Sequence, residues 1–165
     1  MRKRTPISEF VAQTSQVSEI DWARLAAFLD GEGTIFIQRN SHSRGHVLTV
    51  IVANTDTRLI RWLQDTFSGY VYFSHSRSQR SYNSNNICYS WRVLEERAEL
   101  VLVKILPYLI LKKEQAEVGL AYRALKKTGV QGRKITDEVQ QSREAMRDKI
   151  IALNRSIVHK VQKIS

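Results

Sequence analysis

The sequence predicts an α+β fold in which helices alternate with two β-hairpins. Apolar residues recur at helical spacing between residues 18 and 30, whereas β-branched residues alternate with polar ones between 34 and 52. The chain has 165 residues, of which 42% are hydrophobic, and this is enough to bury one core. We therefore expect one domain, 18–160, preceded by an irregular N-terminal arm, 1–17.

The first helix and its two ends can be read directly from the residues. Ser18 followed by Asp21 predicts an N-terminal cap, and Trp22, Leu25, Ala26 and Leu29 recur at helical spacing. The helix is expected to stop at residues 30–33, Asp-Gly-Glu-Gly, where two glycines permit a left-handed turn.

The remaining elements follow in the order hairpin, helix, hairpin and three helices. Strands are expected at 34–42 and 46–52, and at YVYFSHS and ICYSWRV on either side of the polar stretch 77–86. Helices are expected at 55–67, at 95–106, at 108–127 after the break at Pro107, and at 136–160.

The basic charge is concentrated where a binding face would lie. The formal net charge is +10, which favours a polyanionic partner. Both hairpin regions, 34–55 and 66–94, contain no Asp or Glu, although residues 34–94 carry seven arginines. A sheet face built from them suits phosphates and base edges, the alternative being an ordinary solvated face.

Several classes of protein are disfavoured by the composition. No apolar run is long enough to span a membrane, and the polar start has no apolar signal core. The single cysteine, Cys88, allows no internal disulfide, and the four histidines lack a zinc-binding spacing. We expect a soluble intracellular protein without a membrane partner or a small-molecule cofactor.

One segment carries a family resemblance. Residues 25–33, LAAFLDGEG, lie on a helix that enters a strand and resemble the motif that names the LAGLIDADG homing endonucleases. The segments LPYLILKKEQA (106–116) and IIALN (150–154) also look like those of the single-motif, homodimeric members. The resemblance covers most of residues 18–155.

This resemblance implies an α-ββ-α-ββ-α fold with C-terminal helices and an antiparallel four-stranded DNA-binding sheet. It implies a homodimer that binds double-stranded DNA at a long pseudo-palindromic site. The implied reaction is cleavage of both strands with Mg²⁺, leaving short 3′ overhangs, and Mn²⁺ or Ca²⁺ can replace Mg²⁺ for binding. The expected compartment is a bacterial cytoplasm or an organelle.

The resemblance also implies the catalytic positions. Glu32 aligns with the metal-binding acid of the motif, and the carbonyl of Gly31 would add a ligand. Lys112, five residues after Pro107, matches the family's basic residue, while Asn54 and Arg58 match the polar residues that order the attacking water. An N-cap role would explain Asn54 equally well.

Dimer contacts are expected along the motif helix. In the family, small residues let two copies of this helix approach closely, and Ala27 stands here in place of a glycine. The expected interface residues are Trp22, Ala26, Ala27, Leu29 and Asp30. Asp30 is also expected to bond backbone amides near the helix end rather than to bind metal.

The DNA-reading side chains are expected to alternate along the strands. A nine-residue strand, 34–42, spans about 30 Å, which matches about nine base pairs. The expected DNA-binding residues are Thr34, Phe36, Gln38, Asn40, His42, Arg44, Thr49, Tyr72, Ser74, Arg77, Arg80, Cys88, Ser90 and Arg92.

Three other interpretations share parts of this pattern. An intron RNA maturase or a non-cutting DNA-binding regulator would use the same fold and a basic surface. A basic ribosome-associated α/β protein would leave the Asp-Gly-Glu-Gly junction and the acid-free hairpins as coincidences.

Overall fold

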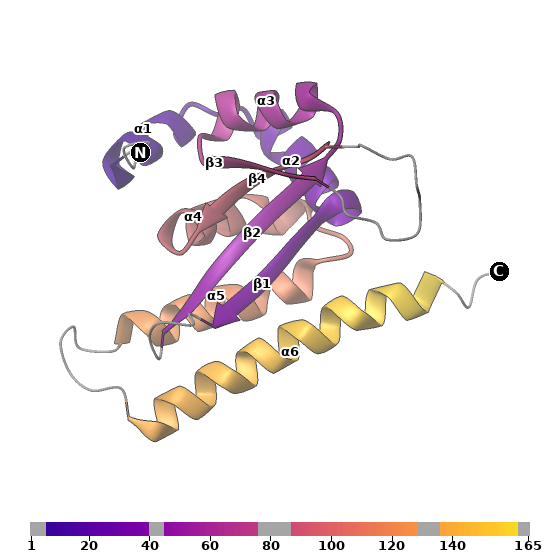
Figure 1. The fold of residues 1–165 in the computed structure, drawn as a ribbon. Coiled ribbons are helices and arrows are strands. Elements are labelled where there is room, and N and C mark those ends of the chain that lie inside the picture. Colours follow the sequence, from indigo (N-terminus) through magenta and orange to yellow (C-terminus); the bar gives the residue numbers. More distant parts are fainter. Residues whose placement is uncertain (1–5, 40–44, 76–86, 129–135, 162–165) are drawn as a thin grey trace.

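The computed structural model describes residues 6–39, 45–75, 87–128 and 136–161 (Figure 1). The elements in chain order are α1 (Ile7–Thr14), α2 (Glu19–Glu32), β1 (Gly33–Arg39), β2 (His46–Asn54), α3 (Thr57–Phe67), β3 (Tyr70–His75), β4 (Ile87–Leu94), α4 (Glu96–Ile105), the 3₁₀ turn η1 (Leu106–Tyr108), α5 (Lys113–Thr128) and α6 (Asp137–Val161). The predicted order of helices and hairpins is confirmed from residue 18 onward.

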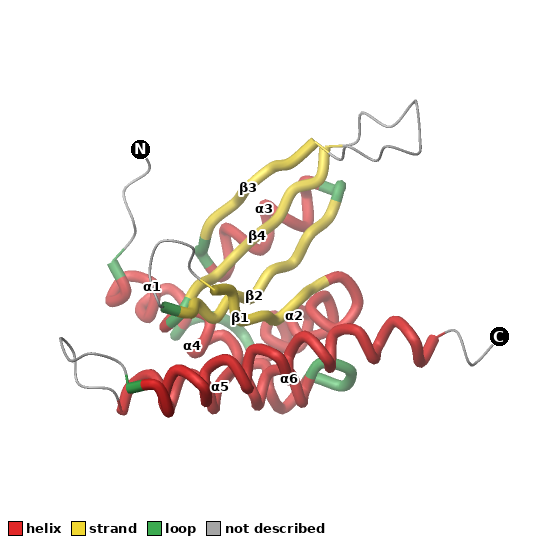
Figure 2. The backbone as a smooth tube through the Cα atoms, turned by 60° about the horizontal axis from the view of Figure 1, so that its bottom comes forward, coloured by secondary structure: helices red, strands yellow, loops and turns green. Residues whose placement is uncertain are grey.

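The four strands form one antiparallel sheet in the order β1-β2-β4-β3. Gly33 lies opposite Val52 in the first hairpin, and Asn54 lies opposite Tyr89 where the two hairpins meet. The two C-terminal strands of the hairpins, β2 and β4, are therefore central, and β1 and β3 are the edges. Figure 2 shows α3 behind β3 and β4.

One face of the sheet is buried against helices. Side chains at alternate strand positions, such as Ile35, Val50 and Trp91, are fully buried with apolar residues of α2 to α5. On the opposite face, Thr34 and Gln38 of β1 are exposed. The alternation predicted for β1 is confirmed, and it leaves the second face open.

The N-terminal segment contains a helix, so the expectation of an irregular arm is wrong. α1 places Phe10 in the core with no exposed surface, and the guanidinium carbon of Arg97 lies 5.2 Å from the centre of that ring. Gln13 donates a hydrogen bond to the Asp65 carbonyl of α3 at 2.8 Å. An eight-residue helix is too short to be stable alone, so these contacts, invisible in the sequence, hold it.

The helix predicted from residue 108 begins at Lys113 instead. η1 and the extended residue Leu109 come first. The carboxylate of Asp30 accepts hydrogen bonds from the backbone amides of Ile110 and Lys112, and this holds the intervening residues as a loop.

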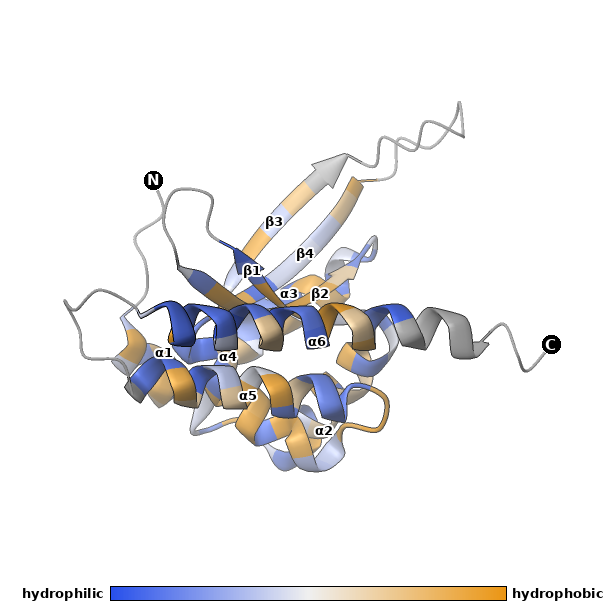
Figure 3. Cartoon of the chain, turned by 90° about the horizontal axis from the view of Figure 1, so that it is seen from below, coloured by the Kyte–Doolittle hydropathy of each residue, from blue (hydrophilic) through white to orange (hydrophobic). Residues whose placement is uncertain are grey.

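The long helix α6 covers the edge strand β1. It lies beside α5 (Figure 3), and Asn154 donates a hydrogen bond to the carbonyl of Ile35 at 3.0 Å. Near the other end of β1, Glu144 accepts hydrogen bonds from Arg39 at 2.5 Å and lies 3.0 Å from the buried His46 ring. These contacts protect a sheet edge that would otherwise expose unpaired backbone groups.

Glu144 is expected to make stability depend on pH. The hydrogen bond from Arg39 and the charge of His46 keep the pKa of Glu144 below its ordinary value of 4.5. A carboxyl group with a lowered folded-state pKa stabilises the fold above its unfolded-state pKa, and this contribution disappears as pH falls through the folded-state pKa. We expect Glu144→Gln to lower the free energy of unfolding at pH 7, by an amount that shrinks toward pH 3.

Urea unfolding at a series of pH values measures this difference. Glu117→Gln, an exposed position on α5, serves as the matched control and should follow the wild type throughout. An equal loss for Glu144→Gln at pH 7 and pH 3 would contradict the role of its charge.

Among the described residues, no helix is both apolar enough and long enough to cross a membrane.

Candidate active site

The motif helix runs directly into the first strand. The hydroxyl of Ser18 accepts a hydrogen bond from the Asp21 backbone amide at 3.2 Å, so the predicted cap is confirmed. α2 continues to Glu32, and β1 begins at the next residue, Gly33. The carboxylate of Glu32 is therefore exposed at the C-terminal end of α2, at one end of the sheet.

The predicted left-handed turn at this junction is wrong. No described residue between 19 and 39 has a positive φ, and Gly33 has an ordinary φ of −98°. Glycine is needed at residue 33 for space instead: an added Cβ would lie 2.7 Å from the Leu29 Cα and 2.8 Å from its carbonyl oxygen. An added Cβ on Gly31 would meet nothing within 4 Å.

Asn54 orients the carboxylate of Glu32. Its side-chain amide donates a hydrogen bond to Glu32 Oε2 at 2.5 Å, and its Oδ1 accepts one from the Asp56 backbone amide at 2.7 Å. The alternative N-cap role is not observed, because Asp56 is the residue that caps α3. The end of β2 therefore fixes one carboxylate oxygen of Glu32 and leaves Oε1 for another ligand.

Arg58 lies one helical turn beyond Asn54 and pairs with Asp56. Its guanidinium bonds both carboxylate oxygens, the shortest distance being 2.6 Å. The hydrogen bond from Arg58 lowers the pKa of Asp56 to about 2. The Arg58 side chain is 90% exposed, so it stands in solvent beside the Glu32–Asn54 pair rather than inside it.

Lys112 is held at the same end of α2. Its ammonium group donates a hydrogen bond to the backbone carbonyl of Asp30, and the residue is only 8% exposed. Burial lowers the pKa of Lys112, which the nearby Asp30 partly opposes. The neighbouring Lys113 is exposed, so burial distinguishes the two adjacent lysines, which the sequence alone cannot do.

Asp30 has the structural role predicted for it. Its two carboxylate oxygens accept hydrogen bonds from the backbone amides of Ile110 and Lys112, at 2.7 and 2.9 Å. Both oxygens are therefore occupied by the loop before α5, and Glu32 is the acid of the motif that remains available.

The donors at this end of the sheet fit a divalent cation that also binds phosphate. Glu32 offers a carboxylate oxygen, and Gly31 belongs to the last helical turn, whose carbonyls lack intrahelical donors. No cluster of three metal-ligating side chains occurs within the described part of the chain. Mg²⁺ commonly takes one or two carboxylates together with water and substrate phosphate, so this donor set suits it.

The open face of the sheet carries many of the predicted DNA-binding residues. Thr34 and Gln38 are exposed and Phe36 is half-buried. Antiparallel partners share a face, which places Tyr72 beside Ser90 and Ser74 beside Cys88. The register also places Arg92 on this face, next to Tyr70 and Ile51.

Two predicted DNA-binding residues are buried within the chain. Thr49 is 2% exposed and Ser90 is 8% exposed, because neighbours on the open face cover them. In the second hairpin, Trp91 and Val93 are buried in the core, whereas Ile87 and Tyr89 are only half-buried. The predicted residues outside the described part are Asn40, His42, Arg44, Arg77 and Arg80.

The predicted dimer contacts need correction. Trp22, Ala26 and Leu29 are buried in the chain's own core, so they do not form its surface. Of the five residues proposed, Ala27 is exposed, and the carboxylate of Asp30 is engaged by the loop before α5. Helical spacing gave a core stripe correctly, but that stripe faces inward rather than toward a partner.

The exposed face of α2 has its own apolar residues, most of which are not among the predicted dimer contacts. Ile20 is 65% exposed and Phe28 37% exposed, and both lie with Ala27 on the outer side of the helix. Ile110 and Leu111, in the loop bonded to Asp30, are 84% and 58% exposed. The available signal was helical spacing: positions 20, 27, 28 and 31 form a second stripe on α2, which is interrupted by the exposed Arg24.

Comparison with known proteins finds similar folds among solved structures. No family model matches the sequence, and no curated protein matches it. The homing endonuclease I-CvuI, in a complex with uncleaved target DNA in the presence of magnesium, matches with a TM-score of 0.62 and 23% identity over 82% of each chain. I-CvuI with its own target and calcium gives a TM-score of 0.59 and 21% identity over the same shares.

A longer protein matches in part. The LAGLIDADG meganuclease I-AabMI, bound to uncleaved DNA, has a TM-score of 0.57 and 15% identity. The match covers 79% of this chain but only 44% of I-AabMI. The chain therefore has the LAGLIDADG homing endonuclease fold, as its motif predicts.

Proposed function

We propose that the chain is a metal-dependent, site-specific double-strand DNA endonuclease that acts as a homodimer. The observation that carries the proposal is the Glu32–Asn54 pair at the end of an open, acid-free sheet face. The fold shared with DNA-bound nucleases supports it.

The sheet supplies the DNA-binding surface. The described strands β1 to β4 contain no Asp or Glu, so nothing on the open face repels phosphates. Side chains at alternate positions reach toward base edges, as a β-sheet in the major groove requires. The active-site end of this face is then fixed by Glu32, where α2 meets β1.

The chemistry depends on oxygen donors and an ordered environment. A divalent ion, when bound, activates a water molecule and offsets phosphate charge. Glu32 would hold that ion with the carbonyl of Gly31, and Asn54 keeps the carboxylate in one orientation. The ammonium group of Lys112 lies at the same end of α2, where its positive charge would offset negative charge at the cut phosphate.

Two copies are needed to cut two strands. Each chain contributes one Glu32, and joining two chains through the outer face of α2 would bring both carboxylates near a two-fold axis. The 44% coverage of the longer nuclease agrees with one chain serving as half of such an enzyme. The exposed residues Ile20, Ala27 and Phe28 give that face an apolar character.

Ala27→Arg is expected to convert the dimer to a monomer. The long charged side chain would stand between two helices that need close approach, and burying it without a partner is unfavourable. Gel filtration with light scattering should give twice the chain mass of 19.1 kDa for wild type and one chain mass for the variant.

Ala145→Arg, at an exposed position on α6, is the matched control and should remain dimeric. A wild-type mass of 19.1 kDa at micromolar concentration would refute the homodimer.

A cleavage selection tests the proposed function itself. The chain is incubated with a library of long pseudo-palindromic duplexes in Mg²⁺ or in EDTA, and cut products are sequenced. Double-strand cuts at one site, in Mg²⁺ alone, are the expected result. Specific binding without cuts in any divalent ion would favour a non-cutting DNA-binding protein on this fold.

A further inference from the structure

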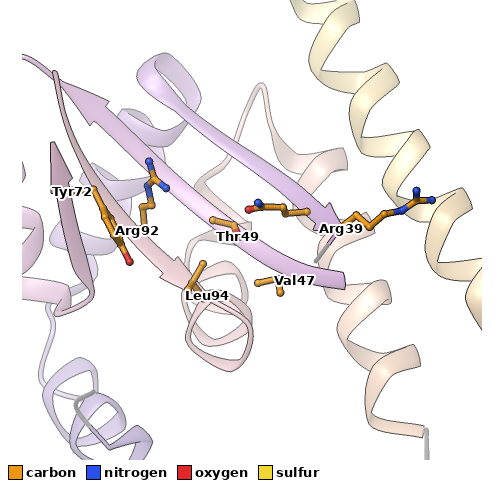
Figure 4. Close-up of a pocket in the computed structure, with 7 residues that line it drawn as sticks. Arg39, Val47, Thr49, Tyr72, Arg92 and Leu94 are labelled. Carbon is orange, nitrogen blue, oxygen red and sulfur yellow. The ribbon is translucent and has the colours of Figure 1, made fainter. Parts of the chain in front are cut away.

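Arg92 is held in one orientation on the open sheet face. Its guanidinium carbon lies 4.7 Å from the centre of the Tyr72 ring, and its Nε donates a hydrogen bond to the Ser90 hydroxyl at 3.2 Å. Figure 4 shows the Arg92 and Tyr72 side chains beside each other on the sheet. A stacked and hydrogen-bonded arginine loses little rotamer freedom when it binds a ligand.

The end of the guanidinium remains available. Among the described residues, neither Nη atom of Arg92 has a hydrogen-bond partner, and the four strands carry no acid to neutralise it. Arg92 borders a hollow of about 310 Å³. The hollow is also lined by Gln38, Val47, Thr49 and Leu94.

We propose that Arg92 reads a guanine in the major groove of each DNA half-site. The proposal rests on the proposed function, because it requires that the open face binds duplex DNA. The two Nη groups form a fork that matches O6 and N7 of guanine, and no other base offers two acceptors there. Tyr72 sets the plane of the fork and Ser90 sets its direction.

The position on the sheet favours a base over a phosphate. β4 is a central strand, so Arg92 faces the middle of the surface, whereas phosphates line the sides of a groove. Val47 and Leu94 make the neighbouring surface apolar, which suits base edges and thymine methyl groups.

The register gives the distance from the catalytic end. Arg92 lies three residues along β4 from Tyr89, the partner of Asn54. This is about 10 Å at roughly 3.3 Å per residue. It corresponds to about three base pairs farther from the cut than the contact nearest Asn54.

The experiment is a binding selection with half-site libraries, made in a Glu32→Gln background so that DNA is bound but not cut. With Arg92 present, one position in each half-site is expected to require guanine. Arg92→Ala should lower the preference for guanine at that position by roughly 5- to 150-fold and leave the other positions unchanged. Arg92→Gln should shift the preference to adenine, since glutamine pairs with its N6 and N7.

Companion variants separate orientation from charge. Tyr72→Phe keeps the ring and should keep the guanine preference, whereas Tyr72→Leu removes the platform and should weaken it. Arg61→Ala, an exposed arginine on α3, should leave every position unchanged. Thermal unfolding of each variant establishes that it is folded.

Two results would overturn the proposal. If Arg92→Ala weakens binding equally for all sequences and reduces the salt dependence by about one charge, Arg92 contacts a phosphate. If the base preferences of Arg92→Ala equal those of its parent, Arg92 reads nothing. Either result leaves the nuclease proposal intact, whereas a chain that binds no duplex DNA would refute both.

Discussion

Glu32→Gln is expected to abolish DNA cleavage, with a loss of more than about a thousandfold in rate, because several kcal/mol of transition-state stabilisation depend on the bound ion. The amide that replaces the carboxylate carries no charge for a divalent cation. It has nearly the same shape, and Glu32 is exposed, so the fold should be unaffected. Affinity for the target should stay within a few-fold, since under the proposed function the sheet face would provide most of the contacts.

Single-turnover cleavage in Mg²⁺ and a binding titration in Ca²⁺ measure the two quantities separately. Glu117→Gln is the matched control and should cut at the wild-type rate. Asn54→Ala should fall between the two, because the carboxylate remains but loses the hydrogen bond that orients it. Cleavage by Glu32→Gln at the wild-type rate would refute the assignment of this site.

The second large effect comes from two glycines that are two residues apart. Gly33→Ala is expected to destabilise the fold by about 3 kcal/mol, because its Cβ would contact the backbone of Leu29, which cannot move aside. Gly31→Ala is expected to stabilise an isolated chain by about 0.5 to 1 kcal/mol, since alanine favours the helix and its Cβ meets no atom.

These two glycine variants distinguish effects on folding from effects on dimerisation. Gly31 is exposed on α2, so under the homodimer proposal Gly31→Ala places a methyl group between the two helices. We expect this variant to keep a high melting temperature but to dimerise and cut more weakly. Melting at low concentration, gel filtration and cleavage measure the three effects. A Gly33→Ala variant as stable as wild type would contradict the contact with Leu29.

The fold could be predicted well where the pattern is local. The cap at Ser18, both hairpins and the alternation of β1 follow from residue spacing alone. The N-terminal helix α1 could not, because it is held by contacts with Arg97 and Asp65, far away in the sequence. The same reason explains Arg39: its partner Glu144 is 105 residues away.

The residues proposed for the candidate site could be named from the sequence, but the hydrogen bonds among them could not. The family resemblance pointed to Glu32 and Lys112, but periodicity could not show that Asn54 bonds the Glu32 carboxylate or that Asp30 holds the loop before α5. α2 is apolar on two sides, and a helical pattern does not reveal which side faces the chain's own core. The buried position of Thr49 likewise depends on neighbouring strands rather than on its own strand.

The bond between Lys112 and Asp30 has a consequence for how the protein is made. The two residues are 82 positions apart, so the motif helix leaves the ribosome long before the loop that completes its end. A shortened translation product that ends before residue 110 would carry Glu32 and Asn54 but would lack both Lys112 and the two backbone amides that donate hydrogen bonds to Asp30. Under the proposed function, DNA cleavage would therefore require that most of the chain has been synthesised.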